Sequence, residues 1–372
     1  MIMKLMKFIL ILIPVMILCA CGTEKSSENG HSGTEIPLTY AEQFSIYENS
    51  DGTYEINIAD GQKFIFVPDG TEKPENTDIP VIFQPENIYV SASSAMDLFD
   101  GIDALGNVKM TSTKINDWKL PAVEKALESG DIQYIGKYNA PDFEAIISGD
   151  CDLAVESTMI YHSPETKEQL ENLGIPVIVE RSSYESHPLG RFEWIKLYGL
   201  ITGNFEKSVE FFDDKTKIFE EVVSDEISGQ KPVVAFFYIT GNGAVNVRKT
   251  GDYISKMIEL AGGTYIFTAE DLGTDENALS TMNMDMETFY EKAHDADIII
   301  YNSTIDGELE SIQQLTEKNG LLKDFRAVQT GNVWCTGRNM FQQTTGMCDM
   351  IRDFHLIIAG NNENPTFLKK LE

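Results

Sequence analysis

Cysteine is scarce in this sequence. Five cysteines occur in 372 residues, and two of them, Cys19 and Cys21, lie close to the N-terminus. The other three, Cys151, Cys335 and Cys348, show no metal-site spacing. An odd number allows at most one disulfide, for which Cys335 with Cys348 is the only local candidate. We therefore expect unpaired buried thiols and no disulfide framework.

Basic residues are also few. Lys and Arg number 29 against 59 Asp and Glu, so the chain carries a formal net charge of −30. This balance argues against nucleic acid as a partner and against binding to anionic lipid through a basic face. It is compatible with a cationic partner surface or a cationic ligand, although we expect most of the acidic residues to form solvated surface.

The sequence lacks the patterns of a resident metal, a nucleotide site or an active site. Direct zinc or manganese capture usually needs clustered ligands, whereas the five histidines are scattered as His31, His162, His187, His294 and His355. Glu185-Ser186-His187 resembles part of a hydrolase site, but no Gly-x-Ser-x-Gly elbow precedes a helix. The turn Gly241-Asn242-Gly243 is too short to indicate a nucleotide site. We expect no enzyme activity and no cofactor.

A long apolar run occurs only at the N-terminus. Lys4 and Lys7 precede FILILIPVMIL, which is typical of an export signal and short for a permanent membrane span. The run ends in Leu-Cys-Ala-Cys, which is similar to the bacterial lipobox and implies cleavage before Cys21 and acylation of Cys21. The alternative is a signal peptide with an incidental cysteine. We expect a signal peptide over residues 1–20 and a disordered tether over residues 21–36.

Two patterns of hydrophobic residues follow the tether. Alternation over residues 37–79 indicates antiparallel strands, and from residue 80 onward strand-like and helix-like segments alternate, which favours parallel sheets covered by helices. Within this second region, the apolar stripe from Asn204 to Gly229 predicts a long amphipathic helix, with Asn204 as its N-cap. We expect an α/β fold: Rossmann-like lobes over residues 80–202 and 230–372, joined by one long helix over residues 203–229, plus the small N-terminal β segment.

These features together resemble a known family. The lipobox, the two lobes, the single helix, and the phrases GDCDLAVESTMI and YESHPLGRFEWIKLYG are similar to substrate-binding proteins of ABC importers, of the type that serves iron–siderophores, haem and cobalamin. The resemblance covers roughly residues 80–365. It implies a lipid-anchored protein at the extracytoplasmic face of the cell membrane. It also implies a metal-complex ligand held between the lobes, with an ABC permease and its ATPase as partners.

The resemblance further implies one permease-docking glutamate on each lobe. Glu144 matches by its position eight residues before Asp152, and Glu287 is the second candidate, ten residues before Asp297. The alternative for both is a first-turn carboxylate that the helix dipole stabilises. Two other functions stay open: a direct metal-ion binding protein, and a surface-anchored sensor or enzyme that reuses the fold.

Candidate ligand contacts lie at strand exits and in the loops after them, where α/β sheets usually bind ligands. The polar segment ERSSYESHPLGRFEW contributes Tyr184, Glu185, His187 and Arg191. A structural turn, with Arg191 paired to Glu185 or Glu193, is the alternative. The remaining candidates, including loop residues, are Ser93, Ser94, Trp118, Glu156, Ser157, Tyr238, Arg248, Lys249, Asn302, Arg338 and Phe341.

Overall fold

The structure is a computed structural model that describes residues 33–75, 77–225, 227–361 and 365–372. The predicted signal peptide, the lipidation site Cys21 and most of the tether lie outside the described residues. The prediction of a tether to residue 36 is wrong at its end, because Thr34–Ile36 forms strand β1.

The N-terminal lobe contains a five-stranded parallel sheet with the order β12-β11-β6-β7-β8. Its strands are β6 (Ile88–Val90), β7 (Val108–Thr111), β8 (Gln133–Tyr134), β11 (Leu153–Ser157) and β12 (Val177–Glu180). The helices between them are α1 (Ser93–Gly101), α2 (Pro121–Ser129), α3 (Phe143–Ser148) and α4 (Pro164–Asn172), with a short hairpin of β9 (Gly136–Lys137) and β10 (Ala140–Pro141) before α3. This alternation is the predicted one.

The sheet of the C-terminal lobe is mixed. Its central strands β13, β17 and β18 are parallel to one another, and β15 pairs in parallel with β13. The antiparallel pairs are β13 with β14, β14 with β16, and β18 with β19. The strands are β13 (Val233–Ile239), β14 (Val245–Arg248), β15 (Thr264–Tyr265), β16 (Thr281–Met284), β17 (Ile298–Tyr301), β18 (Val333–Thr336) and β19 (Leu368–Lys370). The helices are α8 (Tyr253–Leu260), α9 (Ala269–Leu272), α10 (Met286–Ala293), α11 (Ile312–Lys318), α12 (Arg326–Thr330) and α13 (Met347–Ile358).

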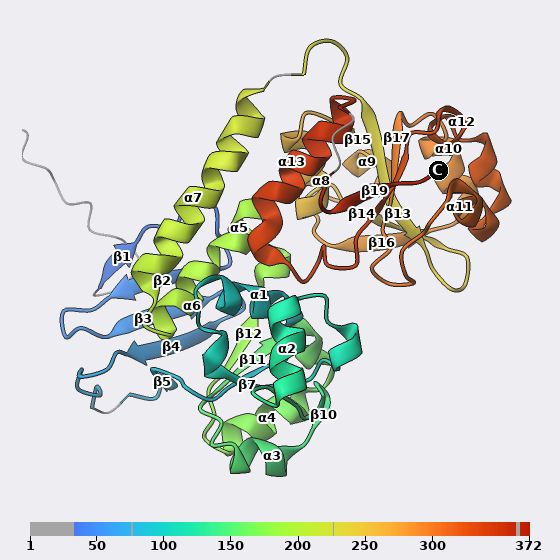
Figure 1. Ribbon diagram of the computed structural model, residues 1–372. Helices are drawn as coiled ribbons and strands as arrows, with labels where there is room; N and C mark the ends of the chain where they lie inside the picture. Colours follow the sequence, from blue (N-terminus) through green and yellow to red (C-terminus); the bar gives the residue numbers. More distant parts are fainter. Residues whose placement is uncertain (1–32, 76, 226, 362–364) are drawn as a thin grey trace, which may run out of the picture. The chain divides into compact units, whose positions relative to one another are not determined.

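One long helix, α7 (Phe205–Ser224), carries the chain from the first lobe to the second (Figure 1). It follows α5 (Pro188–Glu193) and α6 (Ile195–Ile201), and packs against α6 and α13. The helix ends at Ser224, before the predicted Gly229. Its buried stripe ends on Val222, whereas Val223 is 44% exposed. Val223 continues the sequence spacing of alternating four- and three-residue steps, from which a helix of 3.6 residues per turn gradually drifts.

The N-terminal β segment is a five-stranded sheet that is larger than predicted. It has the order β1-β2-β3-β4-β5, with β2 (Phe44–Glu48), β3 (Tyr54–Ile58), β4 (Gln62–Val67) and β5 (Val81–Phe83). The turn between β3 and β4 contains Asp60 and Gly61, both with positive φ, as a tight hairpin requires. Alternating residues on one face join the main hydrophobic core, where the Phe44 ring lies 4.9 Å from the Trp194 ring.

Candidate functional site

A cavity of about 520 Å³ lies between the two lobes. Both lobes line it, at the loops that follow the carboxyl ends of the parallel strands. From the N-terminal lobe come Ser93, Ser94, Thr158, Met159, His162, Ser183, Tyr184 and Arg191. From the C-terminal lobe come Tyr238, Asn246, Arg248, Asp252, Tyr253, Ser280, Thr281, Asn302, Thr304, Ile305 and Phe341. Its size lies within the range of small-molecule sites.

Two arginines define the charge of this cavity. Arg191 of α5 is 4% exposed, and its guanidinium lies 4.1 Å from the ring centre of Tyr253 in the opposite lobe. Arg248 of β14 lies 5.1 Å from the Phe341 ring and 3.5 Å from the carboxylate of Asp252. Burial raises the pKa of Asp252, whereas Arg248, the Ile254 backbone nitrogen and Arg191 lower it. Stacked guanidinium groups are held in place, so they can pair with anionic oxygens at little further entropic cost.

Direct hydrogen bonds join the lobes beside the cavity. The Thr344 hydroxyl donates to the backbone oxygen of Ser94 at 2.8 Å. Thr345 donates from its backbone nitrogen and its hydroxyl to Asp97 Oδ2, at 2.7 and 2.6 Å. Burial raises the pKa of Asp97 to about 6, although these donors oppose the shift. The lobes are therefore held together by a second connection besides α7.

Eight of the residues that we predicted as ligand contacts line this cavity. They come from strand exits, from α5 and from loops, and they are Ser93, Ser94, Tyr184, Arg191, Tyr238, Arg248, Asn302 and Phe341. The structure brings these residues together from segments up to 248 positions apart in the sequence, because the strands that carry them end at the same side of each sheet.

The structure places Glu185 away from the cavity, contrary to the prediction, and the alternative in which Arg191 pairs with Glu185 or Glu193 is also wrong. Glu193 is fully buried and accepts hydrogen bonds from the backbone nitrogens of Thr39, Tyr40 and Ala41 at 2.7–3.0 Å. Glu185, also fully buried, accepts from two more backbone nitrogens, those of Glu42 and Gln43, and from Trp194 Nε1. The two carboxylates thus bind residues 39–43, a segment that we call the N-terminal strap.

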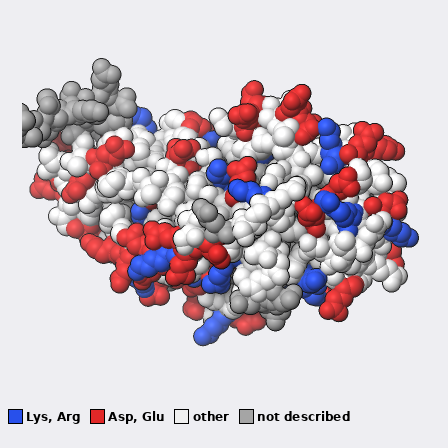
Figure 2. All heavy atoms as spheres, turned by 90° about the horizontal axis from the view of Figure 1, so that it is seen from above, with Lys and Arg blue, Asp and Glu red and all other residues white. Residues whose placement is uncertain are grey.

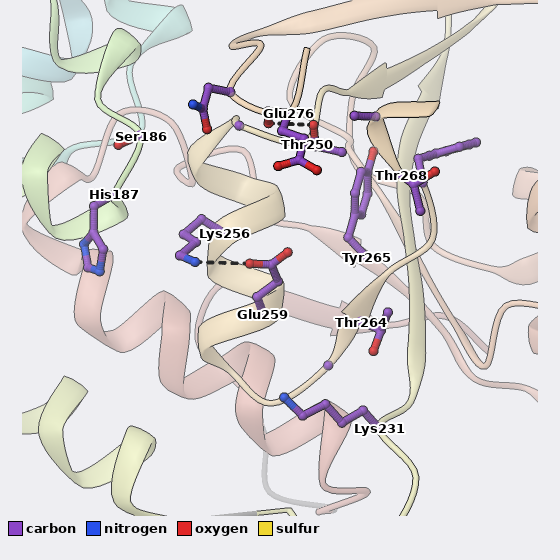
Figure 3. A pocket seen from close by; sticks show the side chains of 15 residues that line it. Ser186, His187, Lys231, Thr250, Lys256, Glu259, Thr264, Tyr265, Thr268 and Glu276 are labelled. Carbon is purple, nitrogen blue, oxygen red and sulfur yellow. Dashed lines mark hydrogen bonds and ion pairs between the residues drawn. The ribbon is translucent and has the colours of Figure 1, made fainter. Parts of the chain in front are cut away.

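His187 lines a different cavity, of about 790 Å³, where it faces Lys256 of α8 (Figure 3). Its ring stacks on Tyr40 of the strap at 4.6 Å, and its Nδ1 accepts a hydrogen bond from the Leu189 backbone at the start of α5. Burial lowers the pKa of His187 to about 4, and the charge of Lys256 contributes. A neutral imidazole that caps a helix and packs on the strap has a structural role here.

The other candidates also lie outside the cavity. Trp118 is fully buried and donates from Nε1 to the Thr113 backbone. Ser157 accepts from the Met159 backbone at the start of a 3-10 turn, Arg338 is exposed, and Lys249 does not line the cavity. Glu156 is fully buried, and neither of its oxygens has a hydrogen-bond partner in the part of the chain that the structure describes. Strand-exit position alone did not separate these side chains, because successive residues of a strand point to opposite faces.

Several cavity residues escaped the sequence analysis. Asn246, Ser280 and Thr281 belong to or border the antiparallel strands β14 and β16, which we did not predict. Asp252 and Tyr253 stand at the start of α8, whose N-cap is Asp252. The alternation of Val245 and Val247 after the Gly-rich turn was the available signal for β14, and it is typical of a hairpin strand.

The two predicted docking glutamates occupy matching positions. Asp142 caps α3 and Asp285 caps α10, so Glu144 and Glu287 are each the second residue of their helix. Both are exposed. The two extra residues between Glu287 and its strand belong to the helix, because α10 has 8 residues and α3 has 6.

The aspartates after these helices match too. The carboxylate of Asp152 accepts from the backbone nitrogens of Glu86 and Asn87, before β6. Asp297 accepts in the same way from Val233 N, at the start of β13. The two lobes therefore share the same arrangement of a capped helix followed by an aspartate that binds the backbone before a central strand.

The expected solvated acidic surface is visible, and two of the three described cysteines are buried as expected. Figure 2 shows acidic side chains spread over the visible face, with basic ones among them. Cys151, Cys335 and Cys348 are free thiols, of which Cys151 is only partly buried.

Among the described residues, no group of three or more His, Cys, Asp or Glu could hold a metal ion. No helix in the described part of the chain has the length and apolarity to cross a membrane.

Two α/β lobes, one connecting helix and a cavity between the lobes define a two-lobe binding protein. Residues 88–339 match the periplasmic binding protein family, so the chain belongs to that family. The uncharacterised lipoprotein MJ0872 of Methanocaldococcus jannaschii is 24% identical over 353 residues, which cover 90% of this chain and 87% of the relative.

Solved structures share the fold. A periplasmic haem-binding protein from Pseudomonas aeruginosa has a TM-score of 0.61 at 14% identity, covering 77% of this chain and 98% of that protein. The vitamin B12-binding protein BtuF of Vibrio cholerae has a TM-score of 0.53 at 15% identity, covering 76% of this chain and all of that protein (100%). The N-terminal sheet precedes the part of the chain that matches the family.

Proposed function

We propose that this protein is the substrate-binding component of an ABC importer and that it captures an anionic metal complex, such as an iron–siderophore chelate, or a related haem or cobalamin ligand. The observation that carries the proposal is the cavity between the lobes. Each lobe contributes one arginine that stacks on an aromatic ring, Arg191 from the N-terminal lobe and Arg248 from the C-terminal lobe. The haem-binding and vitamin B12-binding proteins that share its fold support this class of ligand.

The chemistry of the cavity favours a chelate over a bare metal ion. Guanidinium groups repel a free cation, whereas their planar N–H groups match the paired oxygens of carboxylates and catecholates. Tyr184, Tyr238 and Phe341 supply aromatic surface for the organic part of such a ligand. Met159 and Ile305, which are 49% and 68% exposed, add apolar surface from each lobe.

Delivery would involve the outer ends of both lobes and the membrane anchor. Glu144 and Glu287 sit exposed at the second position of equivalent helices, where they could meet cationic groups of a permease. Acylation of Cys21 would hold the protein at the extracytoplasmic face of the membrane. The matching helix positions of the two glutamates support this arrangement.

Isothermal titration calorimetry with ferric citrate, haemin and cyanocobalamin tests the ligand class. We expect at least one of them to bind with a Kd below roughly 10 μM. Arg191→Ala should weaken that binding by roughly ten- to a hundredfold, because a charged hydrogen-bond donor is lost. Arg352→Ala, at a half-exposed arginine of α13, is the control and should change nothing. Binding by no probe contradicts the ligand class, and unchanged binding in Arg191→Ala contradicts the site.

A further inference from the structure

A buried carboxylate lies directly behind the residues with which the N-terminal lobe lines the cavity, a set that we call the N-terminal wall. Glu180, the last residue of β12, is 3% exposed. Its Oε1 accepts from the Ser182 backbone at 2.9 Å, and its Oε2 accepts from the Ser94 hydroxyl at 3.3 Å. Burial raises the pKa of Glu180, and Ser182, Arg191 and Ser94 oppose that shift. Glu180 itself does not line the cavity, whereas Ser94 and Arg191 do.

The hydrogen bond from Ser94 to Glu180 decides what Ser94 can offer to a ligand. A serine hydroxyl has one proton and two lone pairs. Because the proton points to Glu180, only lone pairs remain for the cavity. Ser94 is also fixed through its backbone, where its oxygen accepts from Thr344 of the other lobe. This hydroxyl therefore accepts a hydrogen bond from a ligand N–H or O–H group and cannot donate one.

Glu180 also acts on Arg191. Its negative charge is one of the groups that the buried guanidinium faces, and Arg191 Nε has no hydrogen-bond partner among the described residues. A partly compensated arginine attracts an anionic ligand group less strongly than an uncompensated one, since both charges act over the same buried region.

We propose that Glu180 is a positioning residue of this cavity, which makes Ser94 a pure hydrogen-bond acceptor and moderates the charge of Arg191. The inference rests on the proposed function and specifies the ligand: a group with an N–H or O–H donor beside an anionic oxygen fits this wall better than two anionic oxygens. Glu180 sets this preference without touching the ligand.

Glu180→Gln reverses both effects without changing the size of the side chain. The Ser182 backbone N–H holds the amide oxygen at the position of Oε1, so the amide NH₂ takes the position of Oε2 and faces Ser94. The Ser94 proton is then free to point into the cavity, and the charge near Arg191 is lost. Ligands that present only carboxylates gain affinity, and ligands that present amide donors lose it.

Haemin and cyanocobalamin are suitable probes, because the polar groups at the edge of haemin are carboxylates and those of cyanocobalamin are mainly amides. We expect Glu180→Gln to shift the ratio of their dissociation constants by about tenfold in favour of haemin. If only one of them binds, haemin should bind more tightly to the variant, or cyanocobalamin less tightly. An unchanged ratio, or an unchanged Kd of the single binder, overturns the proposal.

Glu156→Gln is the matched control. Glu156 is equally buried and lies on the neighbouring strand β11, but its register partner is Val179, so it faces the opposite side of the sheet from Glu180. Glu156→Gln should leave the ratio of the haemin and cyanocobalamin dissociation constants unchanged. If it shifts this ratio as much as Glu180→Gln does, the positioning role of Glu180 is overturned.

A second measurement needs no ligand. Thermal unfolding of Glu180→Gln, Ser94→Ala and the double variant forms a double-mutant cycle. We expect the two changes in Tm to be non-additive by about 1 °C or more, since the residues share a hydrogen bond. If none of ferric citrate, haemin and cyanocobalamin binds to the wild-type protein, the proposed ligand class fails. Additivity in this cycle separately rejects the role of Glu180.

Discussion

The carboxylate of Glu193 accepts a hydrogen bond from the backbone nitrogen of Tyr40 at 2.7 Å, although 153 positions separate the two residues. The same carboxylate accepts from Thr39 and Ala41 and pairs with the Lys196 ammonium at 2.7 Å. Tyr40 in turn packs its ring against Phe212 and Phe219 of α7. The strap is therefore held against the connecting helix by a buried carboxylate whose oxygens are fully used.

Glu193→Ala should destabilise the protein by about 3–5 kcal/mol, because removing one partner of a buried pair leaves the other charge uncompensated. Here the lost partner also leaves three backbone N–H groups of the strap without an acceptor. Chemical denaturation measures the free energy of unfolding. Glu210→Ala, at an exposed position of α7, should stay within about 0.5 kcal/mol of the wild type. A similarly small effect in Glu193→Ala would contradict the role of the strap.

His187 should make the protein less stable in mild acid. Its folded-state pKa is about 4, below the ordinary value of 6.5, so the unfolded chain binds the proton first as pH falls. The stability that the neutral ring contributes is fully present above pH 6.5 and is lost progressively toward pH 4. His187→Asn keeps an acceptor for the Leu189 backbone but does not titrate in this window.

The measurement is the change in Tm between pH 7 and pH 4.5, compared between variants. We expect a smaller drop in His187→Asn than in the wild type, even if its Tm at pH 7 is lower through the loss of stacking on Tyr40. Asp97 and Glu156 have raised pKa values, so they stabilise the folded protein as pH falls, opposite to His187. Their contribution is the same in each variant and cancels when the changes in Tm are compared. His294→Asn, at a half-exposed histidine, should keep the wild-type drop. An equal drop in all three proteins would rule out His187 as the cause.

Permease docking should depend on Glu144 and Glu287. Binding of the protein to its detergent-solubilised permease, measured by biolayer interferometry, should weaken roughly tenfold or more in the double alanine variant. Wild-type binding should also weaken as salt is raised, because exposed charges are screened. Haemin or cyanocobalamin binding in the cavity should not change. Glu165→Ala, in the first turn of α4, is the control; equal losses in both variants would point to general surface charge.

Local pattern predicted most of the framework. The strand–helix alternation of the N-terminal lobe, the hairpins of the N-terminal sheet and the long helix all follow from periodicities of two and 3.6 residues. The C-terminal lobe was harder, because β14 and β16 are short antiparallel strands beside a Gly-rich turn and carry few apolar residues. Their absence from the prediction removed Asn246 and Ser280 from the candidate site.

The fold class, the two lobes and most arginine and aromatic residues that line the cavity could be predicted from the sequence alone. In a parallel sheet, the residues that follow each strand lie at the same edge of the sheet, so their position is known once the strands are predicted. The sequence could not assign roles to the buried glutamate carboxylates. Glu156 and Glu185 were both predicted as ligand contacts, yet Glu156 has no hydrogen-bond partner among the described residues and Glu185 holds the strap. Glu180 and Glu193, which were not candidates, bind Ser94 and the strap. Only tertiary structure decided among them, since the partner of a buried charge is a distant backbone or side chain that no local pattern encodes.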